Sequence, residues 1–300
     1  KAGPGTLVLT RAAAIQDTTV SGGILRVEDP ASLGSGPITV TRGSLEVAPG
    51  VVLQGSGVMV NGGMLSAGSL TVGGGGLTSV TVTSGGIGGR PAIDIVGGGT
   101  LILPSDSRTV VTAASLAVDD FGGLLDLGAS MITFGPGGAV KDDLRVDILA
   151  GRRNGWTGTT GITSSAAAAT SGREVGYIVN PDGSGKVGYA AAGDIDLNGA
   201  VSVFDLVGIN GSGTYGAGIP SDWSTGDFNF DGKTNVFDLV AINTAGVYGA
   251  GNYLPPASGG PGPSAISAVP EPGSLGLGGL AVAGAIALLR RRLAANRRAL

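Results

Sequence analysis

The stretch that decides the fold of this chain reads Thr18-Thr19-Val20-Ser21-Gly22-Gly23-Ile24-Leu25-Arg26-Val27. Apolar and polar residues alternate on both sides of a glycine pair, which is typical of two short strands that each bury one face. Glycine adopts the positive φ that a corner between such strands needs. We interpret the stretch as one rung of a repetitive β structure.

The Gly-Gly-aliphatic-Leu phrase of this rung recurs through the first half of the chain. Its leucines Leu25, Leu45 and Leu65 follow one another at equal intervals. A period of about 20 residues is typical of solenoids, in which each turn packs only on its neighbours. Glycine occupies 59 of the 300 positions and aromatic residues make up only 4%, so small and aliphatic side chains must fill the interior. The pattern predicts a mainly β solenoid over residues 1–134.

The first rungs resemble the autotransporter-associated β-strand repeat of bacterial passenger domains. The residues that carry the likeness are Gly5-Thr6-Leu7-Val8-Leu9-Thr10, the rung quoted above and Leu33-Gly34-Ser35-Gly36-Pro37-Ile38-Thr39-Val40. The resemblance implies a right-handed parallel β-helix.

Residues 135–190 are expected to form a cap and connector. The segment Val140–Leu149 has the apolar spacing of a helix. The segments Glu174–Val179 and Lys186–Ala190 can pair as strands, because the residues between them favour a turn. Such a hairpin would cover the last hydrophobic rung of the solenoid.

The chain contains no cysteine and no histidine. Thiolate nucleophiles, disulfides, Ser-His triads and ordinary zinc or copper sites are therefore excluded. The remaining ligand chemistry uses carboxylate, amide and hydroxyl oxygens, which suit hard cations such as calcium. Basic residues form no stripe with interleaved aromatics outside the C-terminal arginines, so we expect no nucleic-acid partner.

Two segments repeat the pattern of an EF-hand loop, which has oxygen ligands at positions 1, 3, 5, 7, 9 and 12 and glycine at position 6. The first loop offers Asp194, Asp196, Asn198, Ala200, Ser202 and Asp205, with Gly199 at position 6. The second loop offers Asp227, Asn229, Asp231, Lys233, Asn235 and Asp238, with Gly232 at position 6. Ala200 and Lys233 would contribute their backbone carbonyls. We predict two bound Ca²⁺ ions.

The charge of residues 191–254 supports this prediction. Seven Asp face a single Lys there, a net charge of −6 that would repel itself without a cation. The alternative to calcium binding is a pair of turns that are rich in Asp, Asn and Gly and bind no metal. It is weakened because the two loops match each other position for position.

One short helix is expected after each loop, because apolar segments follow at 204–210 and 237–243. The duplicated loop and helix resemble a type I dockerin. The resemblance implies two calcium ions and a helical face for a protein partner, which in cellulosomes is a cohesin.

The C-terminal region begins with a linker at 255–268 that is rich in Pro, Gly and Ser. Pro270, Glu271 and Pro272 follow, and after them come an apolar run, Leu275–Leu289, and a cluster of arginines. The run would give about 22 Å of helix, short of a hydrocarbon core of about 30 Å. The arginines would stay on the cytoplasmic side.

This arrangement over 269–300 resembles the PEP-CTERM sorting signal of Gram-negative bacteria. The resemblance implies an exosortase-type partner, cleavage near Pro270-Glu271-Pro272 and at least transient membrane contact through residues 275–289. An ordinary tail anchor is the alternative. In both cases we expect export, with residues 1–268 outside the cytoplasm.

The sequence therefore predicts a right-handed parallel β-helix, a small α-helical calcium module and a C-terminal transmembrane sorting helix. The expected function is that of a non-catalytic surface protein, with a cohesin-like protein and a surface polysaccharide as candidate partners. The alternative is the C-terminal part of a polysaccharide-active enzyme, since parallel β-helices also host lyases and glycosidases. A glycosidase needs two opposed carboxylates, for which the candidates are Asp94, Asp119, Asp120 and Asp126. No basic residue lies near Asp119 and Asp120 to hold an anionic substrate, which favours the non-catalytic alternative.

Overall fold

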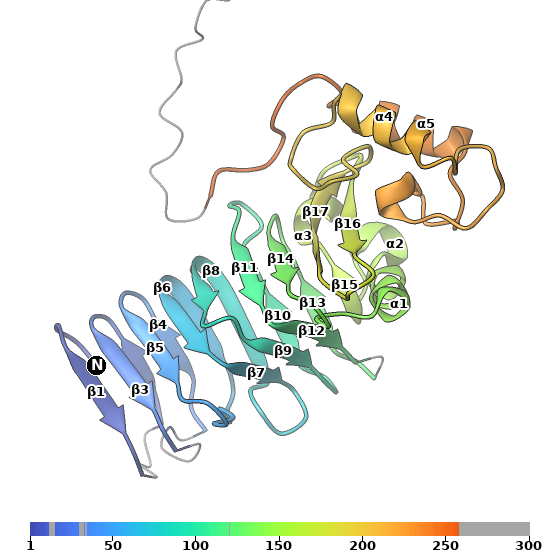
Figure 1. Ribbon diagram of the computed structural model, residues 1–300. Helices are drawn as coiled ribbons and strands as arrows, with labels where there is room; N and C mark the ends of the chain where they lie inside the picture. Colours follow the sequence, from blue (N-terminus) through green and yellow to red (C-terminus); the bar gives the residue numbers. More distant parts are fainter. Residues whose placement is uncertain (12–15, 30–32, 34, 120, 258–300) are drawn as a thin grey trace, which may run out of the picture. The chain divides into compact units, whose positions relative to one another are not determined.

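The computed structural model describes residues 1–11, 16–29, 33, 35–119 and 121–257. Its main feature is a β-solenoid of about six turns, whose strands stack side by side (Figure 1). The strands up to the cap are β1 (Thr6–Leu9), β2 (Thr18–Val20), β3 (Ile24–Val27), β4 (Ile38–Val40), β5 (Ser44–Val47), β6 (Val58–Ala67), β7 (Ser69–Val72), β8 (Ser79–Gly88), β9 (Ala92–Ile95), β10 (Thr100–Ile102), β11 (Val110–Ala113), β12 (Ser115–Val118), β13 (Leu124–Asp126) and β14 (Met131–Phe134). The predicted mainly β solenoid is confirmed.

The strands of the described residues form three sheets, which also include β15 (Gly161–Thr163), β16 (Arg173–Val179) and β17 (Gly185–Ala191). The largest sheet follows the order β1-β3-β5-β6-β8-β10-β13-β15, with β2 and β4 beside it, and the others are β11-β14-β17-β16 and β12-β9-β7. Strands of successive turns pair in parallel, as β3 does with β5 and β5 with β6. The parallel β-helix is therefore confirmed as the architecture of this region.

The leucine of the repeated phrase forms the core. Leu25, Leu45 and Leu65 are register partners in β3, β5 and β6, and all three are buried. Glycine is required at the corner before β5, because Gly43 has φ +86° and a Cβ there would overlap the carbonyl oxygen of Gly23. The equal spacing of these leucines is thus the length of one turn.

The period becomes irregular after β6 for a structural reason. Val58 pairs with Val80 and Leu65 pairs with Ile87, so the turn from β6 to β8 is longer than the turn from β5 to β6, in which Leu45 pairs with Leu65. Leu65 therefore has Ile87 as its next partner rather than Gly85, where the earlier spacing would put it. The pairing is irregular at Asn61, but the spacing is the same on both sides of this residue.

The cap (residues 135–190) contains α1 (Lys141–Gly151), α2 (Arg153–Trp156), β15 (Gly161–Thr163), α3 (Ser165–Ala169), β16 (Arg173–Val179) and β17 (Gly185–Ala191). The expected helix is present as α1, and the expected hairpin is the antiparallel pair of β16 and β17. Strand β17 also pairs antiparallel with β14, which ends the parallel ladder on that sheet.

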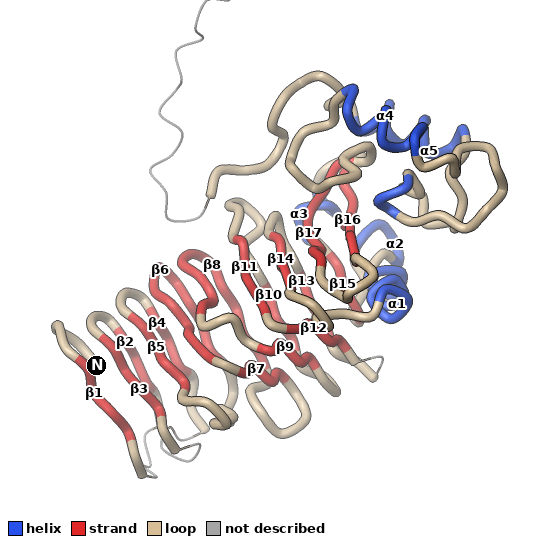
Figure 2. Tube along the Cα trace, viewed as in Figure 1, coloured by secondary structure: helices blue, strands red, loops and turns tan. Residues whose placement is uncertain are grey.

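The region that follows contains α4 (Val203–Gly211), the 3₁₀ helix η2 (Trp223–Thr225) and α5 (Val236–Ala245). Figure 2 shows that, in the part of the chain that the structure describes, the helices lie in the cap and this region. Among the described residues, no helix combines the length and apolar character needed to cross a membrane. The predicted segment 275–289 and the motif Pro270-Glu271-Pro272 lie outside the described residues.

Candidate metal centre

The first loop (residues 194–205) brings three carboxylates together. One oxygen each of Asp194, Asp196 and Asp205 lies within 4.8 Å of the others. Asp194 is 0% exposed and Asp205 is 2% exposed. No ion pair within the described part of the chain involves these three groups. The three carboxylates repel one another, two of them are buried, and none forms one of these ion pairs. Such a group is suited to binding a hard cation.

Hydrogen bonds fold the first loop around Asp194. Its Oδ2 accepts from the backbone N–H of Gly199 at 2.8 Å and from the Tyr253 hydroxyl at 2.6 Å. Gly199 has φ +96°, the conformation expected at position 6 of such a loop. At the other end, Asp205 Oδ2 accepts from the Ser202 N–H at 2.8 Å.

The second loop (residues 227–238) repeats these bonds. Asp227 Oδ2 accepts from the N–H of Gly232 at 2.9 Å, and Gly232 has φ +84°. Asp238 Oδ2 accepts from the Asn235 N–H at 2.8 Å. Asp227 Oδ1 is buried and has no hydrogen-bond partner, so this oxygen is available to a cation.

The first residue of each loop sits where its charged form is disfavoured. Burial raises the pKa of Asp194 to about 6, against the lowering by hydrogen bonds from Tyr253 and Gly199. Burial also raises the pKa of Asp227 to about 6, and the charges of Asp238 and Asp231 add to the rise. A dication bound to these carboxylates would favour the charged form and oppose both shifts.

The predicted ligands at the middle of the loops form the turns. Asn198 Oδ1 accepts from the N–H of Ala200 at 2.8 Å. In the second loop, Asn229 Oδ1 accepts from the N–H of Asp231 at 2.8 Å, and Asp231 Oδ1 accepts from that of Lys233 at 2.9 Å. Ala200 and Lys233 follow the position-6 glycines in the sequence, and their N–H groups are the donors in two of these bonds.

The side chains at position 9 cap the helices that follow. Ser202 Oγ accepts from the N–H of Phe204 at 3.1 Å, and Asn235 Oδ1 accepts from that of Phe237 at 2.8 Å. Asp205 and Asp238 complete a capping box with these residues. Each helix start is therefore built from the residues that end a loop.

Sequence reasoning missed the apolar residue at position 4 of each loop. Leu197 and Phe230 both have positive φ, 53° and 64°, and both are buried. A non-glycine residue in this conformation is uncommon, and its recurrence shows that the two loops share one backbone shape. The signal was present in the sequence, because both loops carry an apolar residue between the ligands at positions 3 and 5.

Phe230 enters an aromatic cluster on the cap. Its ring lies 6.1 Å from that of Trp156, 6.2 Å from Tyr177 and 6.0 Å from Trp223, measured between centroids. The Arg152 guanidinium lies 5.1 Å from the Phe230 centroid, within range of a cation–π contact. The second loop is thus anchored to residues that belong to the cap.

Leu197 and the first loop reach the same cap. A Cβ at Gly176 of β16 would lie 2.5 Å from Leu197 and 2.6 Å from Trp223, so this glycine gives both side chains room. The Trp223 indole N–H donates to the Asp194 carbonyl at 2.7 Å.

Arg145 of α1 and Arg152, which directly follows α1, form polar contacts with the second loop. Arg145 Nη2 donates to the Phe230 carbonyl at 2.9 Å and lies 3.9 Å from Asp227 Oδ2. Arg152 Nη1 donates to the Asn229 carbonyl at 2.8 Å.

Two of the four carboxylates considered for glycosidase chemistry stabilise turns. Asp119 Oδ1 accepts from the N–H of Phe121, and Asp126 Oδ1 accepts from those of Gly128 and Ser165, so both stabilise turns. Asp94 is exposed in β9, and Asp120 lies outside the described residues.

Among the comparisons with known proteins, one match was found, and it lies in the C-terminal region. Residues 268–292 match the PEP-CTERM protein-sorting motif. The match confirms the motif predicted there and indicates exosortase-dependent sorting to the cell surface. No curated protein and no solved structure matches the chain significantly.

The anchoring of the second loop gives a prediction with a matched control. Phe230 is 6% exposed, whereas Phe237 at the start of α5 is 66% exposed. Phe230→Ala should lower the free energy of unfolding by about 3–5 kcal/mol, because it empties a packed aromatic site. Phe237→Ala should change it by less than about 0.5 kcal/mol, because the ring is on the surface. Urea unfolding followed by tryptophan fluorescence measures both, and equal effects would contradict the anchoring role.

Proposed function

We propose that this chain is a non-catalytic surface protein in which two loops bind one Ca²⁺ ion each. The observation that carries the proposal is the convergence of Asp194, Asp196 and Asp205 within 4.8 Å. The matching backbone of the second loop supports a second ion. Two dications would reduce the charge of residues 191–254 from −6 to −2.

Calcium suits these loops better than a softer or smaller ion. All predicted ligand atoms are oxygens, and each loop supplies more carboxylate and amide groups than the few that Mg²⁺ takes from proteins.

We further propose that the calcium-bound region presents a dockerin-like face to a protein partner of the cohesin type. Helices α4 and α5 each expose two valines and a phenylalanine at equivalent positions, namely Val203, Phe204 and Val207 and then Val236, Phe237 and Val240. An exposed apolar surface of this kind is typical of interaction sites. Because the loops end in the capping boxes of both helices, an ion in each loop would fix the start of each helix.

The proposed role after export is structural rather than enzymatic. Two of the four carboxylates considered for an acid and base pair, Asp119 and Asp126, are engaged by backbone N–H groups in turns. We propose that the exosortase cuts near Pro270-Glu271-Pro272, after the apolar run 275–289 has held the chain at the membrane. Four glycines within that run weaken it as a permanent anchor.

Calcium binding is tested by titration calorimetry on the full chain after chelation. We expect about two ions per chain, with Asp194→Asn and Asp227→Asn each removing one, because each variant loses the position-1 charge. At a hundredfold excess of free calcium over the Kd, each ion should add about 2.7 kcal/mol of stability. Asp142→Asn, on the exposed side of α1, is the control and should keep both sites. Unchanged melting temperature in EDTA, together with no calcium uptake, would refute the proposal.

Processing is tested by mass spectrometry of protein released from the surface of cells. The released protein should give no peptide beyond Ser274, and alanine at Pro270, Glu271 and Pro272 should leave the chain in the membrane fraction. Alanine at Pro255 and Pro256, in the linker, should not alter release. Recovery of released protein that still ends at Leu300 would identify the tail as a plain anchor.

A further inference from the structure

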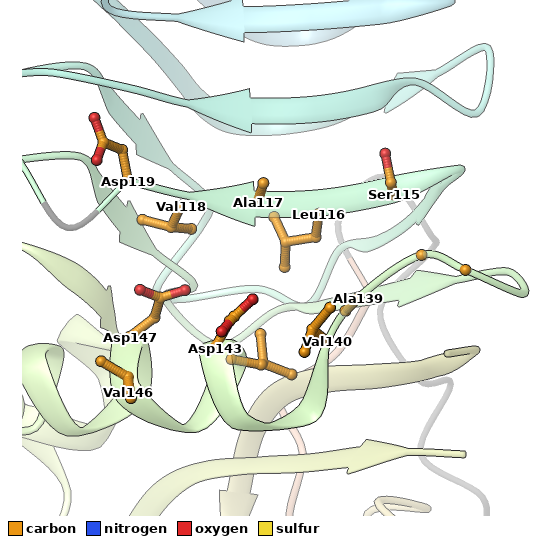
Figure 3. Close-up of a pocket in the computed structure, with 13 residues that line it drawn as sticks. Ser115, Leu116, Ala117, Val118, Asp119, Ala139, Val140, Asp143, Val146 and Asp147 are labelled. Carbon is orange, nitrogen blue, oxygen red and sulfur yellow. The ribbon is translucent and has the colours of Figure 1, made fainter. Parts of the chain in front are cut away.

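The sheet β12-β9-β7 stops one strand earlier than its neighbours. The two other sheets continue into the cap with β15 after β13 and with β17 after β14. After β12 there is no such strand among the described residues, because the chain leaves β14 through a turn and enters α1. A groove of about 570 Å³ remains between β12 and residues 137–147 (Figure 3).

The edge of β12 presents backbone groups to this groove. The Asp119 N–H donates to Ile95 of β9 at 2.7 Å, so the alternation of a parallel ladder turns the N–H groups of Leu116 and Val118 to the opposite side. The Leu116 N–H is taken by the Gly138 carbonyl at 2.8 Å. No described residue pairs with the Val118 N–H, which leaves a donor for an added strand.

The groove is acidic. Asp119, Asp143 and Asp147 line it, and none of its lining residues is basic. Figure 3 shows Asp143 on the side of α1 that faces β12. Its carboxylate is exposed, so a positive group beside it would be favourable.

The basic residues of α1 are committed elsewhere. Lys141 pairs with Asp222, and Arg145 donates to the Phe230 carbonyl. Both partners belong to the calcium-loop region and neither lines the groove. Lys141 and Arg145 are thus directed toward the loops, whereas Asp143 lies toward the sheet edge.

We propose that this groove binds an extended, lysine- or arginine-bearing segment of a partner protein, which adds to β12 as the next strand. An extended backbone matches the free N–H and C=O groups of a sheet edge, and its basic side chains match the carboxylates. Because the Leu116 N–H is already bonded to Gly138, the added strand would pair at the Val118 end of β12. A free cation would use the carboxylates alone and leave the strand edge unmatched. The proposal is independent of calcium binding.

The test uses the full chain and a fluorescein-labelled peptide of about six residues that alternates valine and lysine, long enough to span β12. Fluorescence anisotropy should show saturable binding. Asp143→Lys should weaken binding about tenfold or more, because a like charge replaces an opposite one. Asp142→Lys makes the same change on the same helix but outside the groove, and should alter the Kd by less than about twofold.

A second pair of measurements separates strand addition from charge attraction alone. A peptide with proline in place of valine keeps the lysines but cannot form the ladder, and it should not bind. Val118→Pro removes the free N–H of β12 and should also weaken binding, with circular dichroism showing that the fold is kept.

Several results would overturn the proposal. They are absence of binding, equal binding of the proline peptide, and equal effects of Asp142→Lys and Asp143→Lys. Displacement of the peptide by magnesium at constant ionic strength would assign the carboxylates to a cation instead. Self-association of the free protein that Asp143→Lys abolishes would assign the groove to a second copy of the chain.

Discussion

The antiparallel pairing of β17 with β14 is the contact on which the rest of the structure depends. A parallel solenoid ends in an open rung, whose backbone groups and apolar side chains need cover. Strand β17 supplies that cover on the sheet of β14, and because it runs antiparallel it stops the ladder there. Its last residue, Ala191, accepts the hydrogen bond of the Asp194 N–H at 3.1 Å, so the same strand places the start of the first loop.

The two loops and the cap are joined by contacts of different kinds. Apolar residues at position 4 of the loops pack on β16 and the aromatic cluster, while Arg145 and Arg152 bind carbonyls of the second loop. Tyr253 adds a bond to Asp194 from beyond α5. The acidic oxygens of the loops are thereby held together by the cap, and an ion would relieve their repulsion rather than create the loop shape.

The sequence predicted the features that depend on local spacing. The equal spacing of the first leucines, the turn between β16 and β17 and the duplicated Asp/Asn/Gly pattern are all visible within short windows. The contacts of Arg145 with Phe230 and of Arg152 with Asn229 join positions far apart in the chain, and no periodicity reports them. The turn from β6 to β8 is longer than the turns before it, and for this reason the later leucines depart from the period. The groove beside β12 results from a strand that the chain omits, and spacing carries no sign of it.

The most direct test of the central claim, that the two proposed calcium loops and the cap form one structural unit, is hydrogen exchange measured by mass spectrometry with added calcium and with a chelator. We expect the chelator to speed amide exchange in β16 and β17 as well as in residues 194–238, because the position-4 anchors link them. Exchange in β3 and β5, several turns away, should stay unchanged. Faster exchange confined to residues 194–238, with β16 and β17 as protected as before, would contradict the account.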